Sequence, residues 1–134
     1  MLQAKLIKTI QNRFGKVKTV DSIYIFGSSI HNYTGKESDV DLAFVVNDKN
    51  VKIDSIYVLL QDLPFPRDID ISLISQSSSP LFLYQIISTG MRIYTRNEDQ
   101  ADAFEAYVLR TYYDNAHMRN IYFSYLKQKF SHAS

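Results

Sequence analysis

The sequence predicts an α/β (α+β) fold in which a small mixed β-sheet is flanked by helices. Three segments rich in β-branched and aromatic residues are typical of strands, and helical patterns of apolar residues alternate with them. A long amphipathic pattern near the end of the chain indicates a C-terminal helix. With 134 residues the chain fits one domain, residues 1–134, and the order of elements indicates helices packed on the sheet.

Local patterns predict the elements of the first half. Apolar residues at helical spacing begin at Leu2, with basic residues between them, and predict an amphipathic helix that ends near Gly15. β-branched residues and polar–apolar alternation predict the strands, and an apolar stretch between two of them looks helical. These elements are, in order, strands at 20–26 and 39–46, a helix at 53–63 and a strand at 67–74.

Residues that favour the start or the end of a helix predict the elements of the second half of the chain. Ser79 suits a helix N-cap, Pro80 suits the first helical position, and Gly90 suits the position after the helix ends. The chain then continues with a short edge strand at 91–95 and a long helix at 99–130, for which a break near Asp114 and Asn115 stays open.

Aromatic residues dominate the apolar face predicted for the long helix. That face consists of Phe104, Tyr107, Val108, Tyr112, Ile121, Tyr122 and Tyr125. Tyrosine is also enriched at protein interfaces. We therefore expect most of the tyrosines on this helix to pack on the sheet and some, drawn from Tyr107, Tyr112, Tyr113, Tyr122 and Tyr125, to contact a partner.

The composition argues against several classes of protein. The formal net charge is only +1, so no direct nucleic-acid role is expected. The chain has no cysteine, which excludes disulfides and thiolate metal sites. No apolar run approaches the ~20 residues that a membrane span needs, and the N-terminus lacks the pattern of a signal peptide. We expect a cytoplasmic protein without a membrane role.

Gly27 and Ser28 directly follow a predicted strand. Glycine lets the backbone approach a ligand closely because it has no Cβ. If a helical turn starts at Ser28, its free N–H groups and its hydroxyl would face an anion. A Gly-Ser pair is common, however, and the same residues are also compatible with an ordinary turn.

Two strands carry paired aspartates. Asp39 and Asp41 share one face of the first strand because side chains alternate, and Asp68 and Asp70 share one face of the second. Same-face carboxylates repel each other, and a divalent cation removes that conflict. Oxygen ligands of this kind suit Mg²⁺, and two such ions can clamp an in-line phosphoryl or nucleotidyl transfer. A solvated strand end remains the alternative for the first pair.

The spacing of these features resembles a known family. The segment GSSIHNYTGKESDVDLAF is similar to the signature of polymerase-β-type nucleotidyltransferases, including the ten residues between its Gly-Ser and Asp-Val-Asp parts. SPLFLYQIISTGMRIYTRNED resembles the segment after the third carboxylate of the minimal members. YYDNAHMRNIYFSYLKQ resembles the terminal helix of the minimal nucleotidyltransferase (MNT) antitoxins of HEPN/MNT toxin–antitoxin pairs. The resemblance implies a polymerase-β-like palm fold with a long C-terminal helix.

The resemblance also implies roles for single residues. Gly27 and Ser28 would hold the triphosphate of ATP, and Asp39 and Asp41 would bind the metal ions, which we expect to be two Mg²⁺. Asp70 would be the third catalytic and metal-binding carboxylate; Asp68 is the alternative, and the distance to Ser79-Pro80 favours Asp70. At two positions where family members carry a basic residue and then glycine, this chain has His31 and Asn32.

The implied activity is protein adenylylation (AMPylation). The chain would transfer AMP from Mg²⁺-ATP to a tyrosine hydroxyl of a HEPN-family ribonuclease toxin and so act as an antitoxin. Two alternatives stay open: a non-catalytic antitoxin that neutralises the toxin by binding, and transfer of AMP to a small molecule. The chain is not expected to be the ribonuclease itself. The HEPN ribonucleases carry Arg, a few residues, and then His-x-Tyr, whereas here Arg110 and His117 are followed by Arg119 in place of the tyrosine.

Overall fold

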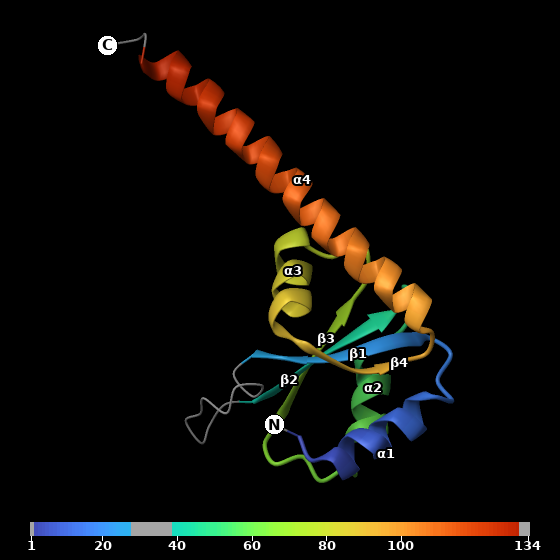
Figure 1. The fold of residues 1–134 in the computed structure, drawn as a ribbon. Coiled ribbons are helices and arrows are strands. Elements are labelled where there is room, and N and C mark those ends of the chain that lie inside the picture. Colours follow the sequence, from blue (N-terminus) through green and yellow to red (C-terminus); the bar gives the residue numbers. More distant parts are fainter. Residues whose placement is uncertain (1, 28–38, 132–134) are drawn as a thin grey trace.

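The computed structural model describes residues 2–27 and 39–131. Figure 1 shows helices packed on both faces of a mixed sheet, as the sequence predicts. The elements are α1 (Ala4–Phe14), β1 (Val20–Phe26), β2 (Val40–Val46), α2 (Ile53–Leu60), β3 (Ile69–Ile74), α3 (Pro80–Thr89), β4 (Met91–Thr95) and α4 (Glu98–Ser131). The predicted strands at 39–46 and 67–74 are shortened at their N-terminal ends, and the helix predicted at 53–63 ends three residues earlier.

The sheet has the strand order β3-β2-β1-β4. β1 runs antiparallel to both of its neighbours, β2 and β4, whereas β2 and β3 are parallel. A parallel pair needs a crossover connection, and α2 supplies it. β4 lies at the edge, as predicted. The ends of β1 and the starts of β2 and β3 therefore meet at one margin of the sheet.

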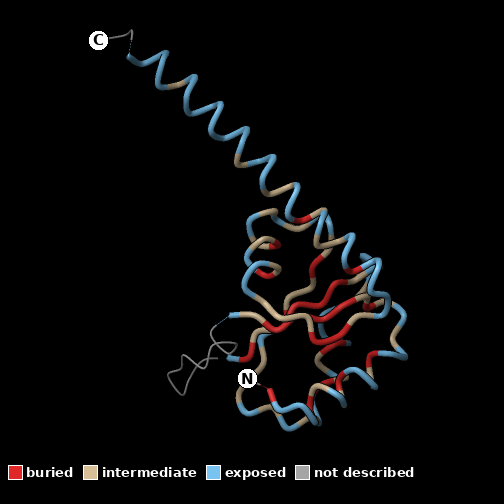
Figure 2. Tube along the Cα trace, viewed as in Figure 1, coloured by how far each residue is buried: buried red, intermediate tan, exposed pale blue. Residues whose placement is uncertain are grey.

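Two apolar layers hold the helices on the sheet. Strand alternation directs Leu42 and Phe44 of β2 into the cluster with α1 and α2, and Ala43 and Val45 into the cluster with α3 and α4. Figure 2 shows the buried residues concentrated along the strands and the inward faces of the helices. Because both faces are covered, a polar residue in β2 is tolerated only near an end of the strand.

The predicted caps of α3 are confirmed. The Ser79 side chain accepts a hydrogen bond from the Phe82 N–H, Pro80 opens the helix, and the Gly90 N–H donates to the Ile86 carbonyl at 2.7 Å. α1 likewise ends at Phe14, directly before Gly15.

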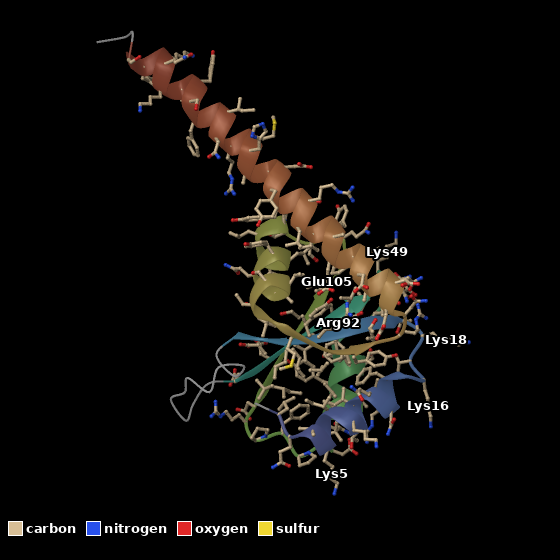
Figure 3. The ribbon with its side chains drawn as sticks, viewed as in Figure 1. Lys5, Lys16, Lys18, Lys49, Arg92 and Glu105 are labelled. Atoms are coloured by element: carbon tan, nitrogen blue, oxygen red, sulfur yellow. The ribbon has the colours of Figure 1, made fainter. Side chains whose placement is uncertain are left out.

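Side-chain contacts fix α4 to the sheet along its first half. Arg92 of β4 reaches two acidic residues of α4, with its Nη1 2.7 Å from Glu105 Oε2 and 3.2 Å from Asp102 Oδ1 (Figure 3). The buried Tyr24 lies beside this pair, and burial raises the pKa of its hydroxyl. Tyr112 of α4 stacks on Tyr84 of α3, with ring centroids 3.7 Å apart.

The second half of α4 departs from the prediction in two ways. The helix runs unbroken from Glu98 to Ser131, so the break left open near Asp114 and Asn115 does not occur. Ile121, Tyr122 and Tyr125, predicted to lie on the core-facing side, are exposed. The reason is geometric: 34 residues span about 50 Å at ~1.5 Å per residue, which is longer than the sheet that the helix covers (Figure 1).

The tyrosines of α4 are accordingly less buried than expected. Tyr107 and Tyr112 are half-buried against the body, whereas Tyr113, Tyr122 and Tyr125 are exposed. Across residues 2–27 and 39–131, no helix combines the length and apolar character that crossing a membrane requires.

Candidate active site

Gly27 ends β1 in a conformation that favours glycine. Its φ is +78°, in the left-handed region that L side chains rarely adopt. A Cβ at this position would overlap Asp41 Oδ2. The backbone of β1 therefore lies directly against a carboxylate of β2, and the neighbouring residue Phe26 pairs with Asp41 in the antiparallel register.

Asp41 and Asp70 are brought together by the parallel register of β2 and β3. They are direct Cα partners, so their side chains leave the sheet on the same face, the one covered by α3 and α4. Asp39 precedes β2 by one residue and is exposed. Gly27, Asp39, Asp41 and Asp70 thus gather at the margin where β1 ends and where β2 and β3 begin.

The carboxylates act on one another. Burial raises the pKa of Asp41, and the negative charges of Asp70 and Asp39 raise it further. A cation near these oxygens would reverse that effect by favouring the charged forms. Within the described ranges, no group of three or more His, Cys, Asp or Glu side chains stands in a position to hold a metal ion. Mg²⁺ is commonly bound by one or two carboxylates together with waters and substrate phosphates, so an all-oxygen pair of this kind fits it.

Asp68 and Asp70 lie in different surroundings. The Asp68 carbonyl accepts a hydrogen bond from the Val40 N–H at 2.8 Å, which starts the pairing of β2 with β3. Asp68 also borders a surface cleft shared with Tyr57 of α2. Its charge is not among the causes that raise the Asp41 pKa, whereas the charge of Asp70 is. The structure therefore places Asp70 beside Asp41, and the role of Asp70 as the third carboxylate stays a prediction.

Some predicted positions lie outside the described residues. Ser28, the predicted partner of Gly27 at the triphosphate, falls in the segment 28–38, as do His31 and Asn32.

Gly90 is a residue of this region that the sequence pattern identified only as the stop of a helix. A Cβ there would overlap the Ile86 carbonyl oxygen and lie 3.0 Å from the Ile25 carbonyl oxygen and 3.3 Å from Phe26 Cβ. The junction of α3 and β4 therefore packs against the last residues of β1, directly before Gly27. Nothing in the local sequence signals this contact, because it joins segments more than sixty residues apart.

The fold and this margin of the sheet define the class of protein. Residues 8–99 match the family described as "Polymerase beta, Nucleotidyltransferase", and the chain belongs to that family. The resemblance of the sequence to polymerase-β-type nucleotidyltransferases is thereby confirmed at the level of the family, and nucleotidyl transfer is the corresponding chemistry.

Solved structures narrow the fold to that of the minimal members. A chain of a mutant MntA–HpeT toxin–antitoxin complex is similar at a TM-score of 0.68 and 17% identity, covering 90% of this chain and 98% of that one. A chain of the complex between a tri-AMPylated Shewanella oneidensis HEPN toxin and an MNT antitoxin is similar at a TM-score of 0.65 and 19% identity. The match covers 94% of this chain and 99% of that one. A chain of a toxin–antitoxin structure with AMP-PNP is similar at a TM-score of 0.63 and 17% identity, and the match covers 90% of this chain and 98% of that one. At this identity the likeness shows the fold. No curated protein matches the chain.

Proposed function

We propose that this chain is an antitoxin that transfers AMP from Mg²⁺-ATP to a tyrosine hydroxyl of a HEPN-family ribonuclease toxin and thereby silences it. The observation that carries the proposal is the meeting of Gly27, Asp41 and Asp70 at one margin of a nucleotidyltransferase fold. In this assignment Gly27 and Ser28 bind the triphosphate, while Asp39, Asp41 and Asp70 hold the metal ions.

The chain's own residues would divide the work as follows. Gly27 has no side chain, so phosphate oxygens can approach its backbone. Asp39 and Asp41 supply hard oxygen ligands, and bound Mg²⁺ would neutralise charge on the phosphates and on the aspartates. Asp70 is exposed and adjacent to Asp41, so it can take the proton of an incoming hydroxyl.

The transfer itself is a single displacement. The acceptor oxygen forms a bond to the α-phosphorus of ATP, the bond from that phosphorus to the bridging oxygen breaks, and pyrophosphate leaves. Positioning and electrostatics would provide most of the acceleration, since no covalent intermediate on this chain is required.

The structural neighbours support the assignment of acceptor and donor. One is the antitoxin complex of an AMPylated HEPN toxin and another contains AMP-PNP, an ATP analogue. Neutralisation by binding alone is the second candidate, and the exposed apolar residues of α4 favour some role in binding. No contact among the described residues favours transfer of AMP to a small molecule.

The experiment combines the chain, the protein encoded in the neighbouring reading frame, Mg²⁺ and ATP, and weighs both proteins by mass spectrometry. The neighbour should gain the mass of one or more AMP units, with label from the α-phosphate and none from the γ-phosphate. Asp39→Asn and Asp41→Asn should abolish the gain and leave the complex intact. Inhibition of the neighbour without a mass change, with both variants inhibiting equally well, would show that the chain acts by covering its target.

A further inference from the structure

The C-terminal half of α4 carries an apolar surface that the described residues leave uncovered. Residues 115–131, here called the distal helix, extend away from the body as a single rod, and Figure 2 shows them almost entirely exposed. Met118 is 62% exposed, Tyr122 59% and Phe130 67%. Ile121, Phe123 and Tyr125 are also exposed. Large apolar side chains gathered in this way indicate an interaction surface.

The apolar residues of the distal helix cover more than one narrow stripe. At about 100° per residue, Met118, Ile121, Tyr122 and Tyr125 follow the i, i+3, i+4, i+7 pattern of one face. Phe123, Leu126 and Phe130 widen that face to roughly 200° of the circumference, again at about 100° per residue. The opposite side is polar and carries Asn120, Ser124, Lys127 and Gln128. The apolar face thus spans about half of the circumference, with Arg119 and Lys129 as the charged residues within it. A face of this width fits a groove between two helices better than a flat surface.

This surface is continuous with the body on the side of α3. Pro80 and Leu81 at the start of α3 form a cleft with Tyr112, Met118 and Arg119 of α4, and Leu81 is 50% exposed. α3 is ten residues long, or about 15 Å at ~1.5 Å per residue. Its other end leads through Gly90 to the end of β1 beside Gly27. A protein seated in the angle between α3 and the distal helix would therefore lie within about one helix length of the candidate active site.

The charge of the distal helix indicates what kind of partner it meets. Residues 115–131 contain three basic residues, Arg119, Lys127 and Lys129, and no acidic residue. None of the three forms an ion pair with the described part of the chain. Two copies paired through their distal helices would bring these cations together, whereas acidic residues around an apolar groove would pair with them.

We propose that the distal helix is the docking element for the acceptor protein, and that it inserts into an apolar, acid-rimmed groove between two helices of that protein. At about 100° per residue, Arg119 and Lys129 project from within the apolar face and Lys127 lies beyond its edge, and their long side chains would reach the acidic rim. The proposal rests on the proposed function only for the identity of the partner. It adds that recognition and chemistry occupy different parts of the chain, joined by α3.

The test measures binding of the full-length chain to the full-length neighbouring gene product by calorimetry, without ATP or Mg²⁺. The paired change Met118→Asp and Tyr122→Asp places two carboxylates on the apolar face. Its matched control, Asn120→Asp and Ser124→Asp, places two carboxylates in the same stretch on the polar side. The first pair should weaken binding by about a hundredfold or more and the control by about threefold at most, because central apolar contacts dominate interface energies. Added salt should weaken binding of the parent chain.

Three results would overturn the docking proposal. The first is equal binding by the two paired variants, and the second is failure of the parent chain to bind. The third is a parent chain that light scattering shows to be a dimer and that Met118→Asp with Tyr122→Asp dissociates, since a second copy would then be the occupant. Thermal stabilisation by Mg²⁺-ATP, measured on each variant alone, checks that the body stays folded.

The outcome separates the docking proposal from the proposed function. If the parent chain binds, the apolar-face variant does not, and no AMP is transferred, the docking proposal stands and the function fails. If AMP is transferred equally well by the parent chain and the apolar-face variant, the function stands and the docking proposal fails.

Discussion

Asp41→Asn should stabilise the protein in the absence of metal and remove its response to Mg²⁺-ATP. Neighbouring strands lie about 4.8 Å apart, so carboxylates on paired residues are separated by roughly 5 Å. At that distance two unit charges repel by about 0.8 kcal/mol at a dielectric constant near 80 and by about 3.3 kcal/mol near 20. Since Asp70 is exposed, the lower end applies, and we expect the free energy of unfolding to rise by about 1 kcal/mol.

The gain should depend on pH in a defined direction. The Asp41 pKa is raised in the folded protein, so the cost of its charge develops as pH rises above the usual value of 3.8 and is complete above the raised pKa. The difference between Asp41→Asn and the parent chain should therefore be largest near neutral pH and vanish in acid. Asp68→Asn removes the same charge from the same region and should give no such gain.

Thermal unfolding by circular dichroism, with and without a chelator, measures these effects. A gain of about 1 kcal/mol corresponds to about 4 °C in a domain of this size. Mg²⁺-ATP at a hundred times its dissociation constant should stabilise the parent chain by about 2.7 kcal/mol and Asp41→Asn hardly at all. Equal stabilisation of the two proteins by Mg²⁺-ATP, or a lower melting temperature for Asp41→Asn at neutral pH, would refute the placement of the site.

Further substitutions test the remaining parts of the structure. Gly27→Val places a branched side chain against Asp41 and should abolish ATP binding in a fluorescent-nucleotide titration while Mg²⁺ still binds in part; unchanged affinity would place the triphosphate elsewhere. Gly90→Ala should reduce the free energy of unfolding by about 1–3 kcal/mol in urea and lower AMP transfer, because α3 must move away from β1; a neutral result would show that this contact yields easily. Arg92→Met should cost about 1–3 kcal/mol in the same assay, since Glu105 loses a charged partner; no loss would mean that α4 is held by its apolar contacts alone.

Short-range patterns were sufficient to predict most of the elements. β1 and β4 have the predicted bounds, and α3 begins and ends where its serine, proline and glycine indicated. These features depend on the conformational preferences of a few adjacent residues, so a short stretch of sequence is enough to predict them. Alternation within β2 also places Asp41 on the face opposite Leu42, as expected.

The pairing of the strands could not be predicted from such local patterns. Alternation puts Asp68 and Asp70 on one side of the chain, and only the register of β3 against β2 puts Asp70 opposite Asp41. The close approach of Gly90 to Ile25 likewise depends on how α3 crosses the sheet. Register and crossing are decided by contacts between segments distant in sequence, which the spacing of residues does not encode.

The long helix α4 shows most clearly what local sequence determines and what depends on tertiary contacts. Its apolar residues determined that α4 would be a helix with a broad apolar side, and they predicted that this side would cover the sheet. In the tertiary structure the distal helix does not cover the sheet, because the sheet is shorter than α4, and the described part of the chain leaves Ile121, Tyr122 and Tyr125 exposed. Periodicity in the sequence determines which side of a helix avoids water, whereas the size and position of the surface beneath the helix determine how much of that side is buried within the same chain.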